Sequence, residues 1–335
     1  MLTRTTQREK TVLVAGGAGF VGSHLCEALL QAGRNVISVD NYLTGLQRNI
    51  ADLRGFARFT SIAHDICDPL EIDGPIDAIY NLACAASPPA YQADPVHTMM
   101  TNVLGTKTLL DLAERHGATF VQASTSEVYG DPEQHPQRED YRGHVNCTGP
   151  RACYDEGKRA AEALCFDFLR AGRADARVAR IFNTYGPRMR PDDGRIVSNL
   201  IVQALKSEPL TIYGSGQQTR SFCYVSDLVR GLMALMDASA NPEMPINLGN
   251  PAEFTINELA DKVVALVPTG SPRLYRPLPC DDPQRRRPDI SRARKTLGWA
   301  PDVTLAEGLP RTIDWFASVI SRPARPAGMA RQSAR

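Results

Sequence analysis

The sequence has no marked excess of either charge. Lys and Arg together number 38, against 37 Asp and Glu, in a chain of 335 residues. A surface so nearly balanced attracts polyanions weakly, so neither nucleic acid nor an anionic membrane is expected as a partner. A local site for a small anion is compatible with this balance.

Spacings typical of metal sites, disulfide frameworks and serine hydrolases are also missing. There is no CxxC pair, no shared histidine face and no G-x-S-x-G elbow, so we expect no bound metal and no hydrolase triad. The thiols are interpreted as reduced. The residues concerned are Cys26, Cys67, Cys84, Cys147, Cys153, Cys165, Cys223 and Cys280, together with His24, His64, His97, His116, His135 and His144.

Neither a signal peptide nor a membrane span is expected before the first strand, because the opening residues, MLTRTTQREK, are polar. We therefore expect a soluble cytoplasmic protein. Residues 321–335 are rich in Pro, Ala and Arg and hold too little apolar surface to order themselves, so a disordered tail is predicted.

Short apolar runs alternate with helical stretches along the first half of the chain. Such alternation predicts an α/β fold with a doubly wound parallel sheet covered on both faces. The texture changes after Pro187, which indicates a smaller lobe with a helix near 196–205 and a strand in PLTIYG. Residues 10–186 and about 221–250 are expected to form the sheet domain, and about 187–220 and 251–320 the C-terminal lobe. The runs are TVLVAG, NVISVD, FTSIAHD, AIYNLA, TFVQAST and ARVARIF.

Gly16, Gly19 and Gly22 lie between the first expected strand and the first expected helix. Glycines there permit a tight turn and close approach of a pyrophosphate to the helix N-terminus, which predicts a dinucleotide site. Asp40 ends the next strand, where a carboxylate reaches the adenosine ribose and repels a 2′-phosphate, so NAD is favoured over NADP. Asp65 ends the third strand and can reach the adenine edge; a plain turn is the alternative for both acids.

Tyr154 and Lys158 stand four residues apart in an expected helix, so both side chains share one face. A free tyrosine has a pKa of about 10, and the Lys158 ammonium group together with a bound nicotinamide cation is expected to favour the phenolate. This spacing alone is common in helices. Upstream, the fifth apolar run ends at Thr125 and Glu127; the hydroxyl can hold the oxygen being oxidised, and the carboxylate can move a second proton. For Glu127, a solvated loop carboxylate is the alternative.

Several segments together resemble the UDP-glucuronate decarboxylases, a family of extended short-chain dehydrogenases, along nearly the whole chain. Thr125-Ser126-Glu127 stands where related 4,6-dehydratases are expected to carry Thr-Asp-Glu, which favours the decarboxylases. The segments are GGAGFVGSHL, ASTSEVYGDPE, GPRACYDEGKR, ARIFNTYGPRM, VSNLIVQAL, LTIYGSGQQTRSF and DDPQRRRPDI.

The resemblance implies a Rossmann domain that binds NAD, a C-terminal lobe that binds a nucleotide sugar, and UDP-glucuronate as substrate. The implied chemistry is oxidation at C4, loss of carbon dioxide from the resulting β-keto acid, and re-reduction at C4 to UDP-xylose. The catalytic residues it implies are Thr125, Glu127, Tyr154, Lys158 and Arg286.

The resemblance also implies which residues bind each ligand. For Arg220 an ion pair is the alternative, and for Arg286 a solvated basic turn. NAD would contact Gly16, Gly19, Phe20, Val21, Gly22, Asp40, Asn41, Asp65, Ile66, Leu82, Thr101, Tyr154, Lys158, Thr184 and Arg195, and the substrate would contact Asn183, Arg220 and Arg286.

Two positions depart from the pattern of the family. Cys84 stands where a serine near the cofactor is usual, and Met100 where a lysine near the substrate is usual. Loss of that ammonium group keeps open a 4-epimerase or 4,6-dehydratase acting on another nucleotide sugar. A catalytically silent NAD-binding regulator is the alternative outside enzymes. Helices near 101–116 and 154–169 resemble those of a four-helix dimer interface in the family, so a homodimer is expected.

Overall fold

A seven-stranded parallel sheet organises the larger lobe of the computed structural model, which describes residues 9–278 and 285–321. The polar first residues and nearly all of the expected tail lie outside the described residues. The strand order, β11-β6-β5-β4-β1-β2-β3, is that of a doubly wound dinucleotide-binding sheet. The strands are β1 (Thr11–Ala15), β2 (Asn35–Asp40), β3 (Phe59–Ala63), β4 (Ala78–Asn81), β5 (Thr119–Thr125), β6 (Ala176–Ile181) and β11 (Ile246–Leu248).

The predicted fold class is confirmed, since β1 to β6 are the strands that the apolar runs indicated. β11 is an addition at the edge beside β6. It has only three residues, too few for a pattern in the sequence to identify it as a strand of the main sheet.

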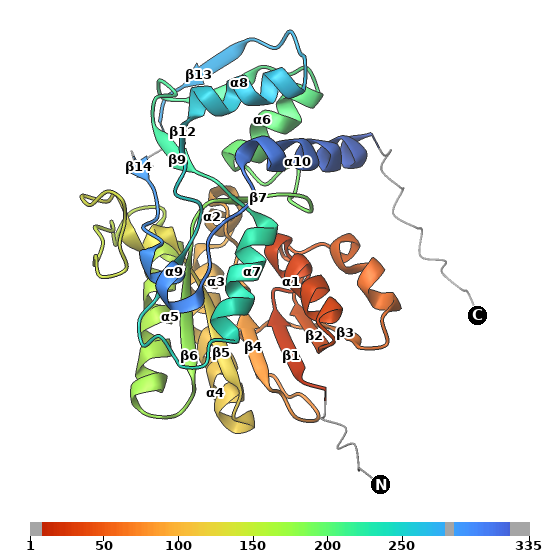
Figure 1. Cartoon of the computed structure of the whole chain (residues 1–335), viewed down its shortest axis with the longest axis vertical. Coiled ribbons are helices and arrows are strands. Elements are labelled where there is room, and N and C mark those ends of the chain that lie inside the picture. Colours follow the sequence, from red (N-terminus) through yellow and green to blue (C-terminus); the bar gives the residue numbers. More distant parts are fainter. Residues whose placement is uncertain (1–8, 279–284, 322–335) are drawn as a thin grey trace.

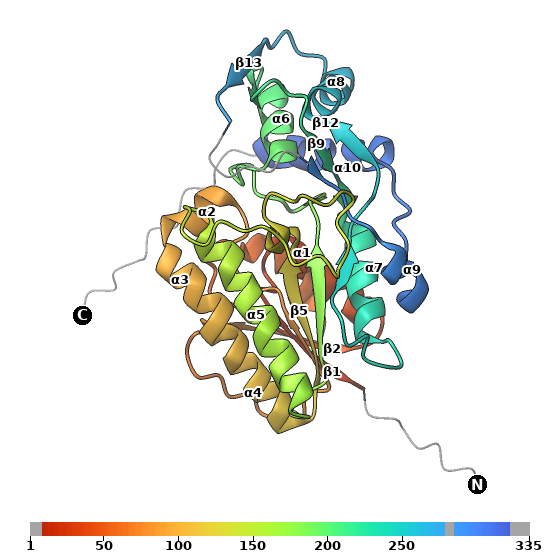
Figure 2. The ribbon, with the colours of Figure 1, turned by 90° about the vertical axis from the view of Figure 1, so that its left-hand side faces the viewer.

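Helices cover both faces of this sheet (Figures 1 and 2). In β1, Val12 and Val14 pack into one core with α1 (Phe20–Gln31) and α7 (Val225–Met236). Leu13 and Ala15 pack into the opposite core with α4 (Thr106–His116) and α5 (Ala152–Arg170). Alternate residues of one strand thus point to opposite faces, as the pleat requires.

α4 ends a longer helical segment than the sequence indicated. A helix from Thr101 to His116 was predicted, but helical structure begins earlier, with α2 (Pro88–Ala93) and α3 (Pro95–Met100). A π-helical segment, η3 (Thr101–Gly105), joins α3 to α4. Pro95 marks the start of α3 and not a break, because proline suits the first helical position. The 3-10 helices are η1 (Gln47–Ile50), η2 (Asp52–Gly55) and η4 (Ser126–Tyr129).

The second lobe lies over the carboxyl ends of the sheet (Figure 1). In it β13 pairs with β8, while β9 lies between β12 and β14, and β7 pairs with β10 where the lobes meet. α9, which falls within the range assigned to this lobe, packs against α7 and β11 of the larger one. The remaining elements of the described chain, from both lobes, are β7 (Thr184–Tyr185), α6 (Ile196–Leu205), β8 (Leu210–Tyr213), β9 (Thr219–Ser221), β10 (Cys223–Tyr224), β12 (Glu253–Thr255), α8 (Ile256–Leu266), β13 (Arg273–Arg276), β14 (Arg285–Arg286), α9 (Ser291–Leu297) and α10 (Leu305–Ile320).

Within the described part of the chain, no helix combines the length and the apolar character that crossing a membrane requires.

Truncation of Phe120 tests the packing of β5 against the helices beneath it. The side chain is fully buried between β5 and the α4–α5 layer, so Phe120→Ala is expected to lower the free energy of unfolding by about 3–5 kcal/mol through a cavity. Urea unfolding followed by circular dichroism measures the change. Leu266→Ala, at an exposed position of α8, is the control and should change it by less than about 0.5 kcal/mol. Equal effects of the two substitutions would contradict the assignment of Phe120 to the core.

Candidate active site

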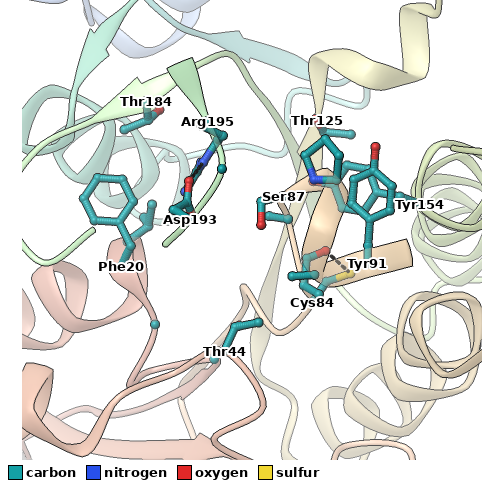
Figure 3. A pocket seen from close by; sticks show the side chains of 18 of the residues that line it. Phe20, Thr44, Cys84, Ser87, Tyr91, Thr125, Tyr154, Thr184, Asp193 and Arg195 are labelled. Atoms are coloured by element: carbon teal, nitrogen blue, oxygen red, sulfur yellow. Dashed lines mark hydrogen bonds and ion pairs between the residues drawn. The ribbon is translucent and has the colours of Figure 1, made fainter. Parts of the chain in front are cut away.

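A cavity of about 1010 Å³ lies between the carboxyl ends of the sheet and the second lobe. Figure 3 shows Thr125, Tyr154, Tyr91 and Cys84 on one side of it and Phe20, Thr184 and Arg195 on the other. The structure brings every residue predicted for the site to this cavity: Gly16, Gly19, Phe20, Val21, Gly22, Asp40, Asn41, Asp65, Ile66, Leu82, Thr101, Thr125, Glu127, Tyr154, Lys158, Asn183, Thr184, Arg195, Arg220 and Arg286.

The glycine turn is shaped to receive a pyrophosphate. Gly16 has φ 78°, in the region that favours glycine. A Cβ on Gly22 would lie 2.0 Å from the Gly16 carbonyl oxygen, so any side chain there would push the turn away from α1. α1 starts directly after Gly19, and its unsatisfied N–H groups and dipole favour an anion at that end. The turn therefore fits a dinucleotide.

Asp40 is fixed at the end of β2 by the backbone. The Ala18 N–H donates to one of its oxygens at 2.9 Å and the Tyr42 N–H to the other at 2.8 Å. Burial raises the pKa of this carboxyl, and those hydrogen bonds oppose the rise. A Cβ on Gly45 would lie 2.6 Å from the carboxylate, so this residue leaves room for it. A fixed acid here suits a ribose with two free hydroxyls and disfavours a 2′-phosphate.

Asp65 lines the cavity beside residues from two other segments. Asn41 donates to its Oδ2 at 2.7 Å, and the His97 Nε2 lies 2.9 Å from the same oxygen. Burial acts to raise the pKa of Asp65, but hydrogen bonds from the Cys67 backbone, Asn41 and His97 outweigh it and hold the pKa well below its usual range. Asp65 is thus a carboxylate at neutral pH.

Tyr154 and Lys158 lie on one face of α5, as expected, and burial opposes ionisation of the tyrosine. Burial, with a contribution from Cys84, raises the pKa of the Tyr154 phenol above its ordinary value, while a hydrogen bond with Thr125 opposes this. The Lys158 Nζ lies 5.8 Å from the Tyr154 ring centroid and donates to the Ala123 carbonyl at 2.9 Å. Burial also lowers the pKa of Lys158. In the protein alone, desolvation of the phenol outweighs its attraction to the ammonium group.

Glu127 is partly buried between guanidinium groups and is not a solvated loop carboxylate. Arg286 forms a two-pronged ion pair with it, with one contact of 2.9 Å, and Arg151 donates to it at 2.6 Å. Burial acts to raise the pKa of Glu127, but the charges of Arg286 and Arg151, with a smaller effect of Arg220, lower it to about 2. Glu127 is therefore ionised, the two guanidinium groups make it a weak base, and Arg286 is no exposed basic turn.

Three residues of this region were missed from the sequence. Arg151 lines the cavity from the N-cap of α5, and Tyr91 stacks on Tyr154 with ring centroids 5.0 Å apart. Asp155 is buried beside Glu127; burial first, and then the Glu127 charge, raise its pKa to about 7. The closeness of Arg151 and Asp155 to Tyr154 in the sequence was a usable signal. Nothing in the sequence marked Tyr91, which comes from α2.

The two departures from the family pattern have different outcomes. Cys84 lines the cavity, and its sulfur accepts a hydrogen bond from Asn102 at 3.2 Å. Met100, in contrast, is 41% exposed on α3 and is not among the residues that line the cavity. Residue 100 therefore lies outside the lining of this cavity, because α3 turns that position outward.

Residues 12–249 match the NAD dependent epimerase/dehydratase family, and the chain belongs to that family. It is 54% identical over 315 residues to UDP-glucuronic acid decarboxylase 1 of Danio rerio, covering 94% of this chain and 74% of the relative. It is also 54% identical over 306 residues to UDP-glucuronic acid decarboxylase 6 of Arabidopsis thaliana, covering 91% and 88%. The crystal structure of UDP-glucuronic acid 4-epimerase from Bacillus cereus, in complex with UDP-glucuronic acid and NAD, superposes with a TM-score of 0.83 at 30% identity, over 92% of this chain and 99% of that one.

Substitution of Gly22 tests the cofactor turn. Gly22→Val is expected to abolish measurable NAD binding, because its side chain must displace the Gly16 carbonyl. Isothermal titration calorimetry with NAD measures the loss, and a thermal melt shows whether the variant is folded. Gly55→Ala, where a Cβ meets nothing within 4 Å, should bind NAD as the wild type does. A folded Gly22→Val protein with unchanged affinity would show that the dinucleotide lies elsewhere.

Proposed function

We propose that this protein converts UDP-glucuronate to UDP-xylose and carbon dioxide with NAD that is regenerated in each turnover. The observation that carries the proposal is the identity of 53–54% over more than nine tenths of the chain to relatives named UDP-glucuronic acid decarboxylase. The cavity supplies the groups that this chemistry needs. We also propose the two-lobe division given above, in which the sheet lobe holds the cofactor and the second lobe the nucleotide.

In this proposal Tyr154 takes the proton from the sugar 4-hydroxyl while Thr125 holds that oxygen. The glycine turn and Asp40 would hold NAD, which would supply reversible hydride transfer at C4 of the sugar. Tyr154 must then be deprotonated, and its high pKa in the protein alone means that bound groups have to stabilise the phenolate. Lys158, which donates to the Ala123 carbonyl, would contribute to stabilising the phenolate once NAD and the sugar are bound.

Cationic side chains favour an anionic substrate over a neutral one. Arg151, Arg220 and Arg286 lie around Glu127, with Asp155 beside it, so guanidinium groups outnumber carboxyl groups in this region. A uronate and a pyrophosphate can balance that excess, whereas a neutral hexose brings only the pyrophosphate. Guanidinium groups pair with both kinds of anion through parallel hydrogen bonds. The three arginines thus provide positive charge for the substrate in place of the lysine that the family usually carries at position 100.

A 4-epimerase is the second candidate, favoured by the 30% identity to an epimerase solved with UDP-glucuronic acid. It shares the opening oxidation at C4, so only the product separates the two activities.

Incubation of the purified protein with UDP-glucuronate and NAD is expected to release carbon dioxide and yield a UDP-pentose, identified by mass spectrometry and NMR. Tyr154→Phe should lower the turnover by roughly 10²–10⁴-fold. Tyr185→Phe, at another buried tyrosine that is outside the cavity lining, should leave turnover close to that of the wild type. A product with unchanged mass and inverted C4 would favour the epimerase, and unchanged substrate would contradict both activities.

We propose that the protein is a homodimer built on the layer of α3, α4 and α5 (Figure 2). Val96, Met100 and Leu104 repeat at four-residue spacing along α3 and η3 and are respectively 71%, 41% and 44% exposed. An apolar stripe of this kind is commonly covered by a partner. The position of Met100 on this stripe explains why an apolar residue suits it.

The unpaired thiols of the seven described cysteines support a reducing compartment such as the cytoplasm.

A double substitution tests the stripe. Val96→Asp with Leu104→Asp places charges where the apolar contact is expected, and light scattering should report a monomer where the wild type gives twice the chain mass. Leu266→Asp, at an exposed leucine of α8, is the control and should stay dimeric. A monomeric wild type, or a double variant that remains dimeric, would contradict this interface.

A further inference from the structure

Three side chains with different metal-binding atoms meet at the adenosine end of the cleft. Asp65 and Cys67 come from the loop after β3, and His97 comes from α3. Their ligand atoms all lie within 4.8 Å of one another. Among the residues that the structure describes, these are the three His, Cys, Asp or Glu side chains that lie close enough together to share one ion. From these observations we propose that Asp65, Cys67 and His97 bind a zinc ion, and that zinc there competes with NAD.

The donor set fits zinc better than a hard cation. Thiolate, imidazole and carboxylate are ligands of Zn²⁺, whereas Mg²⁺ and Ca²⁺ require oxygen. Bond lengths of about 2.0–2.3 Å place tetrahedral ligands roughly 3.3–3.7 Å apart. The Asp65 Oδ2 and His97 Nε2, now 2.9 Å apart, would separate by a few tenths of an ångström. Cys67 needs a small rotation of its side chain.

Access to the three side chains also suits a metal ion. Cys67 binds a metal as the thiolate, and its proton passes to the solvent when the S–Zn bond forms. All three side chains are partly exposed, which leaves a path for the ion and a fourth position for water.

Zinc at this position would occupy the carboxylate that the cofactor proposal assigns to adenosine. Asp65 and His97 both line the cavity. A metal on the Asp65 Oδ2 would also displace the Asn41 amide, which donates to that oxygen. Zinc and the adenosine end of NAD are therefore expected to exclude one another. This second part of the inference rests on the proposed role of Asp65, whereas metal binding itself does not.

Cobalt(II) titration of the full chain, freed of metal and dinucleotide, tests the site directly. A thiolate-to-cobalt charge-transfer band in the near ultraviolet is expected to saturate at a stoichiometric amount of metal and to disappear when Zn²⁺ is added. Cys67→Ser should abolish the band, and His97→Ala should weaken cobalt binding by at least about tenfold. Cys147→Ser, at an exposed cysteine outside the cavity lining, should leave the band unchanged. Absence of a band in the wild type, or its persistence in Cys67→Ser, would overturn the site.

The competition between zinc and NAD is tested by a separate measurement. Zinc should raise the apparent Kd for NAD in proportion to its concentration in the wild type but not in Cys67→Ser, as read by calorimetry. An unchanged Kd in the wild type, with the cobalt band present, would overturn the competition. The proposed decarboxylase activity is unaffected by either result, because its own test follows carbon dioxide release in metal-free buffer.

Discussion

The alignment of α5 against β5 is the constraint on which the candidate active site depends. Lys158 donates to the Ala123 carbonyl at 2.9 Å, and the Ser124 hydroxyl donates to Glu162 at 2.5 Å. Arg180 on β6 then pairs with the same carboxylate through contacts of 2.9 and 2.8 Å. Buried charges of this kind are costly when a partner is lost, so a shift of α5 along the sheet would be strongly unfavourable. Tyr154 lies one turn before Lys158, and Thr125 directly follows Ser124, so the same contacts place both groups.

The charge around Glu127 follows from the same arrangement. η4 turns this residue inward just after β5, and Arg286 arrives on β14 from the second lobe. The ion pair thereby joins the two lobes across the cavity. An anionic substrate entering between them meets guanidinium groups already held in place, and pre-positioned cations of this kind stabilise negative charge without reorganisation.

The amino-acid pattern was sufficient for the parallel sheet, the glycine turn and the helix that carries Tyr154, because each depends on local periodicity or spacing. It was insufficient wherever a position depends on distant segments. β11 is too short to carry a pattern of its own, and the outward orientation of Met100 depends on how α3 lies against α5. Asp65 and His97 are 32 residues apart and meet only in the folded chain. The high pKa of Tyr154 reflects burial, which sequence spacing does not report.

Decarboxylation and 4-epimerisation begin with the same removal of a proton and a hydride, so Tyr154, Lys158 and Thr125 cannot distinguish them. Epimerisation requires the oxidised sugar to present its other face before the hydride returns, whereas decarboxylation requires its carboxylate to stay aligned with the ketone. Room for the sugar to turn, and contacts that hold its carboxylate, therefore decide the outcome. Tyr91 is packed flat against Tyr154, and Arg151 is fixed on Glu127. These groups restrict that side of the cavity and supply charge there, so in the proposed mechanism the residues around Glu127, and not the tyrosine and lysine that both reactions share, are expected to decide between them.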